Sequence, residues 1–248
     1  MLRLIASSIA VVAALAATAG CNSNPQLAVI EHGGSGPPTL VLLHGYGSSA
    51  SQWAPFTKTI QLPPNGRFVF PDAPEATVPP DGPPGGRGWW PLRLRSHIPP
   101  GRSVPDLSAT RPPGLKIAAS QVRDLLGSLR RSPGGPIVLG GYSQGAMVAS
   151  EVAFQSDVPL AALVLLSGTL VDEASWERNF SRRQALPVFM SHGRFDTVLP
   201  FHVADRMRTK LESAGVRVTW VPFDGGHEIP AEVVVALNEF LNGLSFAH

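Results

Sequence analysis

The hexapeptide Gly140-Gly141-Tyr142-Ser143-Gln144-Gly145 lies directly after the apolar run Ile137–Leu139 and just before a segment of helical periodicity, Met147–Phe154. A serine at the centre of G-x-S-x-G, between a strand and a helix, is typical of a nucleophile elbow. The turn is so tight that the serine must take a strained backbone conformation, and the flanking glycines remove Cβ atoms that would clash. The hexapeptide therefore predicts that Ser143 Oγ stands clear of a sheet, beside the N-terminus of a helix.

Strand-like and helix-like segments alternate on both sides of this hexapeptide. Short, β-branched apolar runs predict buried strands at Thr39–Leu43, Arg67–Phe70, Ile137–Leu139, Ala161–Leu166, Val188–Met190 and Arg217–Val221. Helical periodicity predicts helices over Leu115–Leu129, Met147–Phe154, Ala204–Ala214 and Ala231–Leu241. Near-continuous apolar strands are expected of a parallel sheet that helices cover on both faces. We therefore expect an α/β fold with a mostly parallel central sheet and a right-handed crossover at each step.

A segment rich in proline and glycine interrupts this alternation. Of the 25 Pro and 25 Gly residues, 12 Pro and 6 Gly fall between Pro71 and Gly114. Ordinary connections between a strand and a helix run about 2 to 6 residues. The adjacent indoles Trp89 and Trp90 would form an exposed apolar patch if they were left in water. We therefore expect residues 72–114 to be an insertion, or cap loop, over the site rather than a disordered linker.

Composition excludes several classes of protein. With 44% hydrophobic and 15% charged residues, the chain is neither a disordered polymer nor a coiled coil. The net charge is +2 and no run of five Lys or Arg occurs, so we expect no nucleic-acid partner. A single cysteine, Cys21, excludes an intramolecular disulfide and a cysteine-based metal cluster. No metal-ligand spacing, phosphate loop or dinucleotide fingerprint is present, so we expect neither a metal nor a cofactor.

The N-terminus carries the features of an export signal. Arg3 precedes an apolar stretch, Ile5–Ala19, which is short for a membrane-spanning helix. Residues 1–20 resemble a bacterial lipoprotein signal, which implies lipidation of Cys21 and a polar tether over residues 21–25. The alternative is an ordinary signal cleaved near Ala19, with a free thiol left over. Either route predicts an exported protein of the cell envelope, and lipidation would anchor it to a membrane.

A serine nucleophile needs a base, and histidines that follow Ser143 are the candidates because the chain order of this architecture is serine, acid, histidine. They are His192, His202, His227 and His248. The loop of His227 lies between an expected strand and the last helix, at the strand end where α/β sites assemble. We interpret His192 and His202 as structural turn residues and predict that His227 is the base.

The acid should also follow a strand of the sheet. Asp196 comes after Val188–Met190, and it would hold one imidazole tautomer and stabilise the imidazolium. Asp172 and Glu173, which follow Ala161–Leu166, are the alternative acids.

Four ordered motifs carry a family resemblance. Leu43-His44-Gly45-Tyr46-Gly47, the G-Y-S-Q-G elbow, the segment from His192 to Pro200 and the tail G-G-H-E-I resemble the phospholipase/carboxylesterase family of α/β-hydrolases, which includes the acyl-protein thioesterases. The resemblance implies an α/β-hydrolase domain over residues 26–248 and a triad of Ser143, Asp196 and His227. It also implies an oxyanion hole formed by the backbone N–H groups of Tyr46 and Gln144.

The remaining site predictions concern substrate contacts. Asp72-Ala73-Pro74 and Gly88–Leu92 resemble loops near the acyl pocket of family members, and we expect Trp89, Trp90 and Leu199 to line an apolar pocket. We assign no proton transfer to His44, whose ring would satisfy backbone groups. We expect the side chain of Gln144 to pack or hydrogen-bond locally.

The predicted function is hydrolysis of carboxylic esters through an acyl-enzyme. Thioesterase or lysophospholipase activity on the same triad is the alternative within this class, and the substrate would be a small-molecule ester or a lipid. The alternative from another class is a catalytically silent surface lipoprotein that uses the fold for binding.

Overall fold

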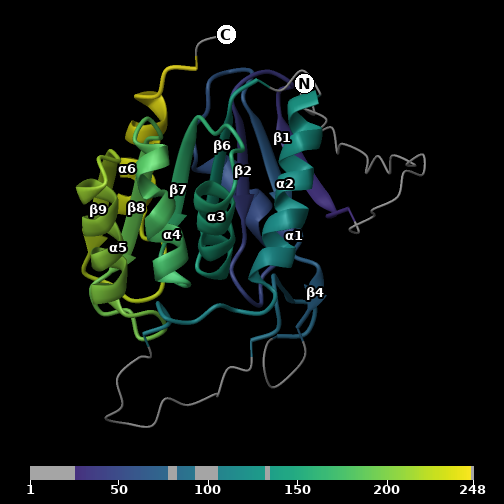
Figure 1. The fold of residues 1–248 in the computed structure, drawn as a ribbon. Helices are drawn as coiled ribbons and strands as arrows, with labels where there is room; N and C mark the ends of the chain where they lie inside the picture. The colour runs from purple at the N-terminus through teal and green to yellow at the C-terminus, as the bar shows by residue number, and fades with distance from the viewer. Residues whose placement is uncertain (1–25, 78–82, 93–105, 132–134, 247–248) are drawn as a thin grey trace, which may run out of the picture.

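A central seven-stranded sheet organises the chain, with strand order β1-β3-β2-β6-β7-β8-β9 (Figure 1). The computed structural model describes residues 26–77, 83–92, 106–131 and 135–246; the predicted signal, Cys21 and the tether lie outside these ranges. The strands are β1 Val29–Gly33, β2 Thr39–Leu43, β3 Arg67–Pro71, β6 Ile137–Tyr142, β7 Ala162–Leu166, β8 Val188–Gly193 and β9 Val218–Phe223. All neighbouring strands are parallel except β1, which is antiparallel to β3. The predicted α/β class is confirmed.

Helices cover both faces of this sheet. They are α1 Ala50–Trp53, the 3₁₀ turn η1 Ala54–Lys58, α2 Leu115–Arg131, α3 Gln144–Gln155, α4 Glu173–Phe180, the 3₁₀ turn η2 Ser181–Arg183, α5 Phe201–Ser213 and α6 Ala231–Asn242. Helices α2 to α5 pack on one face, and α1 and α6 pack on the other. In the described ranges, no helix is long and apolar enough to cross a membrane.

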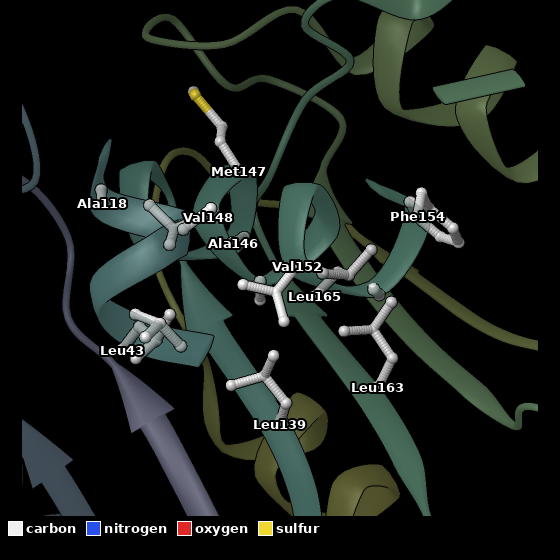
Figure 2. Close-up of a cluster of buried hydrophobic side chains, with 14 of the residues drawn as sticks. Leu43, Ala118, Leu139, Ala146, Met147, Val148, Val152, Phe154, Leu163 and Leu165 are labelled. Atoms are coloured by element: carbon white, nitrogen blue, oxygen red, sulfur yellow. The ribbon is translucent and has the colours of Figure 1, made fainter. Parts of the chain in front are cut away.

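Alternate residues of β2 show why its sequence is a continuous apolar run. Val41 and Leu43 belong to the core that α2 to α5 cover, whereas Leu40 and Leu42 belong to the core beneath α1 and α6. Figure 2 shows the first of these cores, where Val148 and Val152 of α3 lie over the side chains of β6 and β7. Because successive side chains of a strand point to opposite faces, a strand covered on both faces needs apolar residues throughout.

Strand β1 and helix α4 are among the elements that were not predicted from the sequence. Strand β1 is a half-exposed edge strand, so it lacks the apolar run that marks the buried strands. Helix α4 buries only Ser175, Trp176 and Phe180 among its eight residues, so its apolar stripe is weak. Strand β1 runs antiparallel to its neighbour and is the exception in this mostly parallel sheet.

The proline- and glycine-rich insertion, in the part that the structure describes, carries a second, two-stranded sheet. Strands β4 Glu75–Ala76 and β5 Arg87–Gly88 pair antiparallel. The Arg87 guanidinium donates to the carbonyl oxygens of Ala73 and Pro74, which closes the hairpin on itself. These described parts of the insertion are therefore ordered around backbone hydrogen bonds.

Gly145 permits a close approach between α3 and β2. A Cβ at this position would clash with the Leu43 carbonyl oxygen and would lie 2.6 Å from that of His44. We therefore expect Gly145→Ala to lower the free energy of unfolding by about 1–3 kcal/mol, the usual range for overpacking. Chemical denaturation measures this difference.

The matched control is Gly127→Ala, in the interior of α2. Its Cβ would meet only the end of the Arg131 side chain, at 3.7 Å. This variant should gain about 0.5–1 kcal/mol, because alanine loses less backbone entropy than glycine in a helix. Equal effects of the two substitutions would contradict the close packing at Gly145.

Candidate active site

Ser143 lies in a sharp turn between β6 and α3. Its backbone has φ 53° and ψ −117°, a conformation that L residues rarely adopt. Two contacts hold this strained conformation in place. The Ser143 N–H donates to the Leu166 carbonyl oxygen of β7 at 2.9 Å, and α3 packs closely against β2. The turn places Ser143 at the C-terminal end of a central strand.

Loops that follow β8 and β9 bring two further side chains to Ser143. His227 Nε2 lies 2.8 Å from Ser143 Oγ, and His227 Nδ1 lies 2.6 Å from Asp196 Oδ2. Because the carboxylate can only accept, Nδ1 carries the proton and Nε2 is free to accept from the serine hydroxyl. The structure thus joins the predicted nucleophile, base and acid in one hydrogen-bonded chain.

The other candidate acids and bases lie elsewhere. Asp172 pairs with Arg111, and Glu173 pairs with Arg206 and Lys210. His202 is exposed on α5, and His248 is outside the described residues. His192 is not in a turn, as the sequence interpretation had it: it is a buried residue of β8, and its Nε2 lies 3.2 Å from Asp196 Oδ2.

Asp196 is fully buried and accepts hydrogen bonds on both carboxylate oxygens. The backbone N–H groups of Val198 and Leu199 donate to Oδ1 at 2.7 and 2.8 Å. Burial alone would raise the pKa of Asp196, but the hydrogen bonds from His192, His227 and Leu199 outweigh it and hold the pKa well below its usual range. Asp196 is therefore a carboxylate at neutral pH.

A close backbone approach holds the loops of Asp196 and His227 together. A Cβ at Gly193 would lie 2.9 Å from the Gly225 carbonyl carbon and still closer to the carbonyl oxygens of Gly225 and Gly226. The Phe195 N–H donates to the Gly225 carbonyl oxygen at 3.0 Å. The acid and the base are thus carried on one joined pair of loops.

Tyr142, the residue before Ser143, fixes the base from the other side. Its hydroxyl donates to the His227 carbonyl oxygen at 2.7 Å, and the two rings lie 5.0 Å apart. Burial, together with the charges of Asp196 and Glu228, raises the pKa of Tyr142, so the hydroxyl stays protonated. The sequence analysis did not predict this contact. The one local indication of it is the tyrosine hydroxyl next to the serine in the sequence.

The predicted oxyanion loop lies against the elbow. A Cβ on Gly45 would be 3.4 Å from Ser143 Cβ, which places the residue before Tyr46 next to the serine. Among the described residues, the N–H groups of Tyr46 and Gln144 have no hydrogen-bond acceptor. Both are therefore free to donate to an oxygen bound beside Ser143.

His44 holds this loop in place. Its Nε2 accepts from the Ala73 N–H at 3.1 Å, and its Nδ1 lies 2.8 Å from the Gly45 carbonyl oxygen. Burial lowers the pKa of His44, so the ring is neutral. The ring satisfies backbone groups, in agreement with the sequence interpretation.

The model of the phospholipase/carboxylesterase family matches residues 24–245. The chain belongs to this family. Acyl-protein thioesterase 1 of Yarrowia lipolytica is 24% identical over 199 residues, which cover 75% of this chain and 82% of the relative.

Solved structures share the fold of this chain. Esterase PE8 is 25% identical, with a TM-score of 0.72 over 89% of this chain and 100% of its own. Acyl-protein thioesterase 2 of Zea mays is 24% identical, with a TM-score of 0.68 over 86% and 96%. The predicted α/β-hydrolase fold is confirmed, and the chain is a member of a hydrolase family.

The Gln144 side chain hydrogen-bonds to residues far away in the sequence. Its Oε1 accepts from the Trp89 N–H at 2.8 Å, and its Nε2 donates to the Trp90 carbonyl oxygen at 3.0 Å. The Trp89 indole N–H donates to the His44 carbonyl oxygen at 2.8 Å. The expectation of a local contact is therefore wrong: the side chain ties the insertion to the elbow.

The three predicted pocket residues are buried. Trp89, Trp90 and Leu199 are 2%, 3% and 5% exposed and belong to the core covered by α2 to α5. Leu199 also lies in the loop that holds Asp196, since its N–H donates to the carboxylate. A role for these side chains in a substrate pocket stays a prediction.

A charged cluster anchors the other described end of the insertion. Arg206 of α5 lies 2.9 Å from Asp106 and 3.2 Å from Glu173, and it donates to Ser108 Oγ at 2.8 Å. Although burial acts to raise it, hydrogen bonds from Ser108 and Arg206 lower the pKa of Asp106 to about 2. The same network lowers the pKa of Glu173 against the effect of burial.

These lowered pKa values predict how the stability contributed by Arg206 depends on pH. The carboxylates stabilise the fold when ionised, so their contribution is present above about pH 4, their unfolded pKa, and is lost as pH falls toward 2. Arg206→Met should therefore cost about 1 kcal/mol near pH 6, and less as the pH falls. Urea denaturation across this range measures the difference.

Arg208→Met is the control, because the ion pairs of Arg208 with described residues, Asp205 and Glu212, lie within α5. Its cost near pH 6 should be about 0.3–0.5 kcal/mol. A cost of Arg206→Met that is the same at pH 2.5 and pH 6 would contradict the assigned network.

Proposed function

We propose that this protein is a serine hydrolase of carboxylic esters, with Ser143 as nucleophile, His227 as general base and Asp196 as the acid that orients the base. The hydrogen-bonded chain from Ser143 Oγ through His227 to Asp196 Oδ2, at 2.8 and 2.6 Å, carries the proposal. Family membership over residues 24–245 supports it.

Acylation would begin with the serine hydroxyl. His227 Nε2 accepts the proton of Ser143 as Oγ bonds to the ester carbonyl carbon. The oxygen of the tetrahedral intermediate accepts from the N–H groups of Tyr46 and Gln144, each worth about 3–4 kcal/mol to the transition state. Asp196 stabilises the imidazolium without taking its proton. His227 then donates that proton to the leaving alcohol as the C–O bond breaks, which leaves an acyl-enzyme.

Deacylation would repeat these steps with water. His227 Nε2 takes a proton from water as the water oxygen bonds to the acyl carbon. The intermediate collapses, Ser143 Oγ leaves and recovers its proton from His227, and the carboxylic acid departs. The cycle needs no group beyond the chain's own residues and water.

A fluorophosphonate probe tests the proposed nucleophile. The wild type should be labelled stoichiometrically, and peptide mapping should place the label on Ser143. Absence of labelling in a protein that unfolds cooperatively would contradict the proposal and favour the silent binding protein. A series of p-nitrophenyl esters from acetate to palmitate would then define the acyl chain; a preference for short chains would exclude a long-chain lipid substrate.

Thioester hydrolysis is a second candidate, which the relatives named acyl-protein thioesterase favour. The proposed steps are unchanged, except that a thiol leaves in place of an alcohol. Matched oxygen and sulfur esters of one acyl chain separate the two candidates through kcat/KM. A ratio that strongly favours the sulfur ester would assign thioesterase activity.

We also propose that the protein is exported and anchored through a lipidated Cys21, which would place its substrates in the cell envelope. Support comes from residues 1–20 of the sequence, an apolar segment followed by small residues and the lone cysteine. Cys21→Ser should release the protein from the membrane fraction. Unchanged partitioning into detergent would contradict lipidation.

A further inference from the structure

Asp196 contacts a second imidazole that the proposed mechanism leaves unused. His192 Nε2 lies 3.2 Å from Asp196 Oδ2, the oxygen that also lies 2.6 Å from His227 Nδ1. The side chains of His192 and Asp196 are both 0% exposed. One carboxylate oxygen is therefore held between two histidines, one of them buried behind the site.

The partners of His192 define its tautomer. Besides the carboxylate, Nε2 lies 3.0 Å from the Leu199 carbonyl oxygen. Both neighbours are acceptors, so Nε2 carries the proton and donates. Nδ1 is buried without a hydrogen-bond partner among the described residues. The hydrogen bonding of the ring is therefore directed entirely at the loop that carries Asp196.

The contact with His192 completes the polar surroundings of the carboxylate. Two N–H groups of the loop, from Val198 and Leu199, donate to Oδ1, and His227 Nδ1 donates to Oδ2. His192 Nε2 donates to the Leu199 carbonyl oxygen and also lies 3.2 Å from Oδ2, so the carboxylate faces a second buried N–H group. A rotation of the carboxylate away from His227 therefore also changes this contact with His192.

We propose that His192 is a positioning residue, whose Nε2–H holds Asp196 Oδ2 in line with His227 Nδ1. The inference rests on the proposed roles of Ser143, Asp196 and His227. Loss of the Nε2–H leaves the carboxylate free to turn, which weakens its support of the imidazolium. A hydrogen bond to a charged group corresponds to about a 10- to 100-fold effect on kcat. KM should change little, because a side chain buried behind Asp196 does not touch the substrate.

A matched pair of substitutions tests the donor itself. Methionine and glutamine are unbranched and similar in length, but only glutamine ends in an N–H donor. His192→Met should lower kcat about 10- to 100-fold with KM within about twofold, and His192→Gln should recover a large part of the loss. Active enzyme is counted by fluorophosphonate titration, so that unfolded protein does not enter kcat. His202→Met, at an exposed position of α5, is the control for the substitution.

A double-mutant cycle shows whether His192 acts through Asp196. The rate of fluorophosphonate labelling is compared for wild type, His192→Met, Asp196→Ala and the double variant. If His192 acts through the carboxylate, His192→Met should slow labelling strongly in the wild-type background and less than about twofold in the Asp196→Ala background. If the role of His192 is purely structural, His192→Met should slow labelling equally in both backgrounds.

The outcomes separate this inference from the proposed function. Full kcat in His192→Met, equal loss in the Met and Gln variants, or equal losses in the two backgrounds would each overturn the positioning role. If Ser143→Ala keeps its activity, the proposed function itself fails, whatever the His192 variants do. Loss of activity in Ser143→Ala together with full kcat in His192→Met would overturn only the role of His192.

Discussion

Ser143→Ala should lower kcat about 10⁶-fold, the scale of loss when a serine nucleophile is removed. The substitution deletes only Oγ, which lies 2.8 Å from His227 Nε2, and leaves the backbone of the turn unchanged. The oxyanion donors and substrate binding should still give a residual rate about 10³-fold above the uncatalysed reaction. Hydrolysis of a p-nitrophenyl ester under substrate saturation measures this loss.

Ser128→Ala is the matched control for this prediction. Ser128 is half-buried on α2, away from the site, and its hydroxyl donates to the Asp124 carbonyl oxygen within the same helix. Its kcat should equal that of the wild type, and both variants should unfold cooperatively. A kcat for Ser143→Ala within tenfold of wild type would refute the assignment of the nucleophile.

The second-largest effect is expected of Asp196→Asn, about 10⁴-fold in kcat. Because the N–H groups of Val198 and Leu199 donate to Oδ1, the asparagine oxygen must take that position. The amide nitrogen then takes the place of Oδ2 and donates to His227 Nδ1. This forces the proton of His227 onto Nε2, which can no longer accept from the Ser143 hydroxyl. The variant therefore keeps the shape of the side chain at position 196, but His227 loses the tautomer that can accept from Ser143.

Asp157→Asn controls for the same chemical change, since Asp157 is 83% exposed and pairs with Arg182 on the surface. Its ester hydrolysis should match that of the wild type. If Asp196→Asn loses less than tenfold, Asp196 does not set the tautomer of His227 and the role of the acid must be reassigned.

The sequence predicts the buried centre of this fold well because burial on both faces leaves a local pattern. Strand β2 has the predicted bounds, Thr39–Leu43, and β7 differs from its prediction by one residue. Edge strand β1 leaves no such pattern, because it is half-exposed and carries polar residues. The G-x-S-x-G elbow can also be recognised from a short stretch of sequence. Its glycines are required because a Cβ would clash within the turn and with the neighbouring strand.

The contacts that the sequence did not predict join residues far apart in the chain. The apolar run of β8 ends at Met190, so His192 looked like a turn residue; the structure continues the strand and buries the ring against Asp196 and Leu199. Gln144 likewise bonds to Trp89 and Trp90, more than 50 residues away. No local pattern marks such a partner, because a polar side chain has the same sequence neighbours whether it is solvated or buried.

The two anchors of the insertion bear on how this family can diversify. Trp90 is bonded to the elbow through Gln144, and Asp106 is paired with Arg206 of α5. Both anchors are fixed by contacts outside the stretch between them, residues 93–105. The contacts that hold Ser143, Asp196 and His227 together also lie outside that stretch. The sequence between the anchors and the sequence of the reacting groups are therefore under separate constraints, so one can vary in evolution while the other is retained.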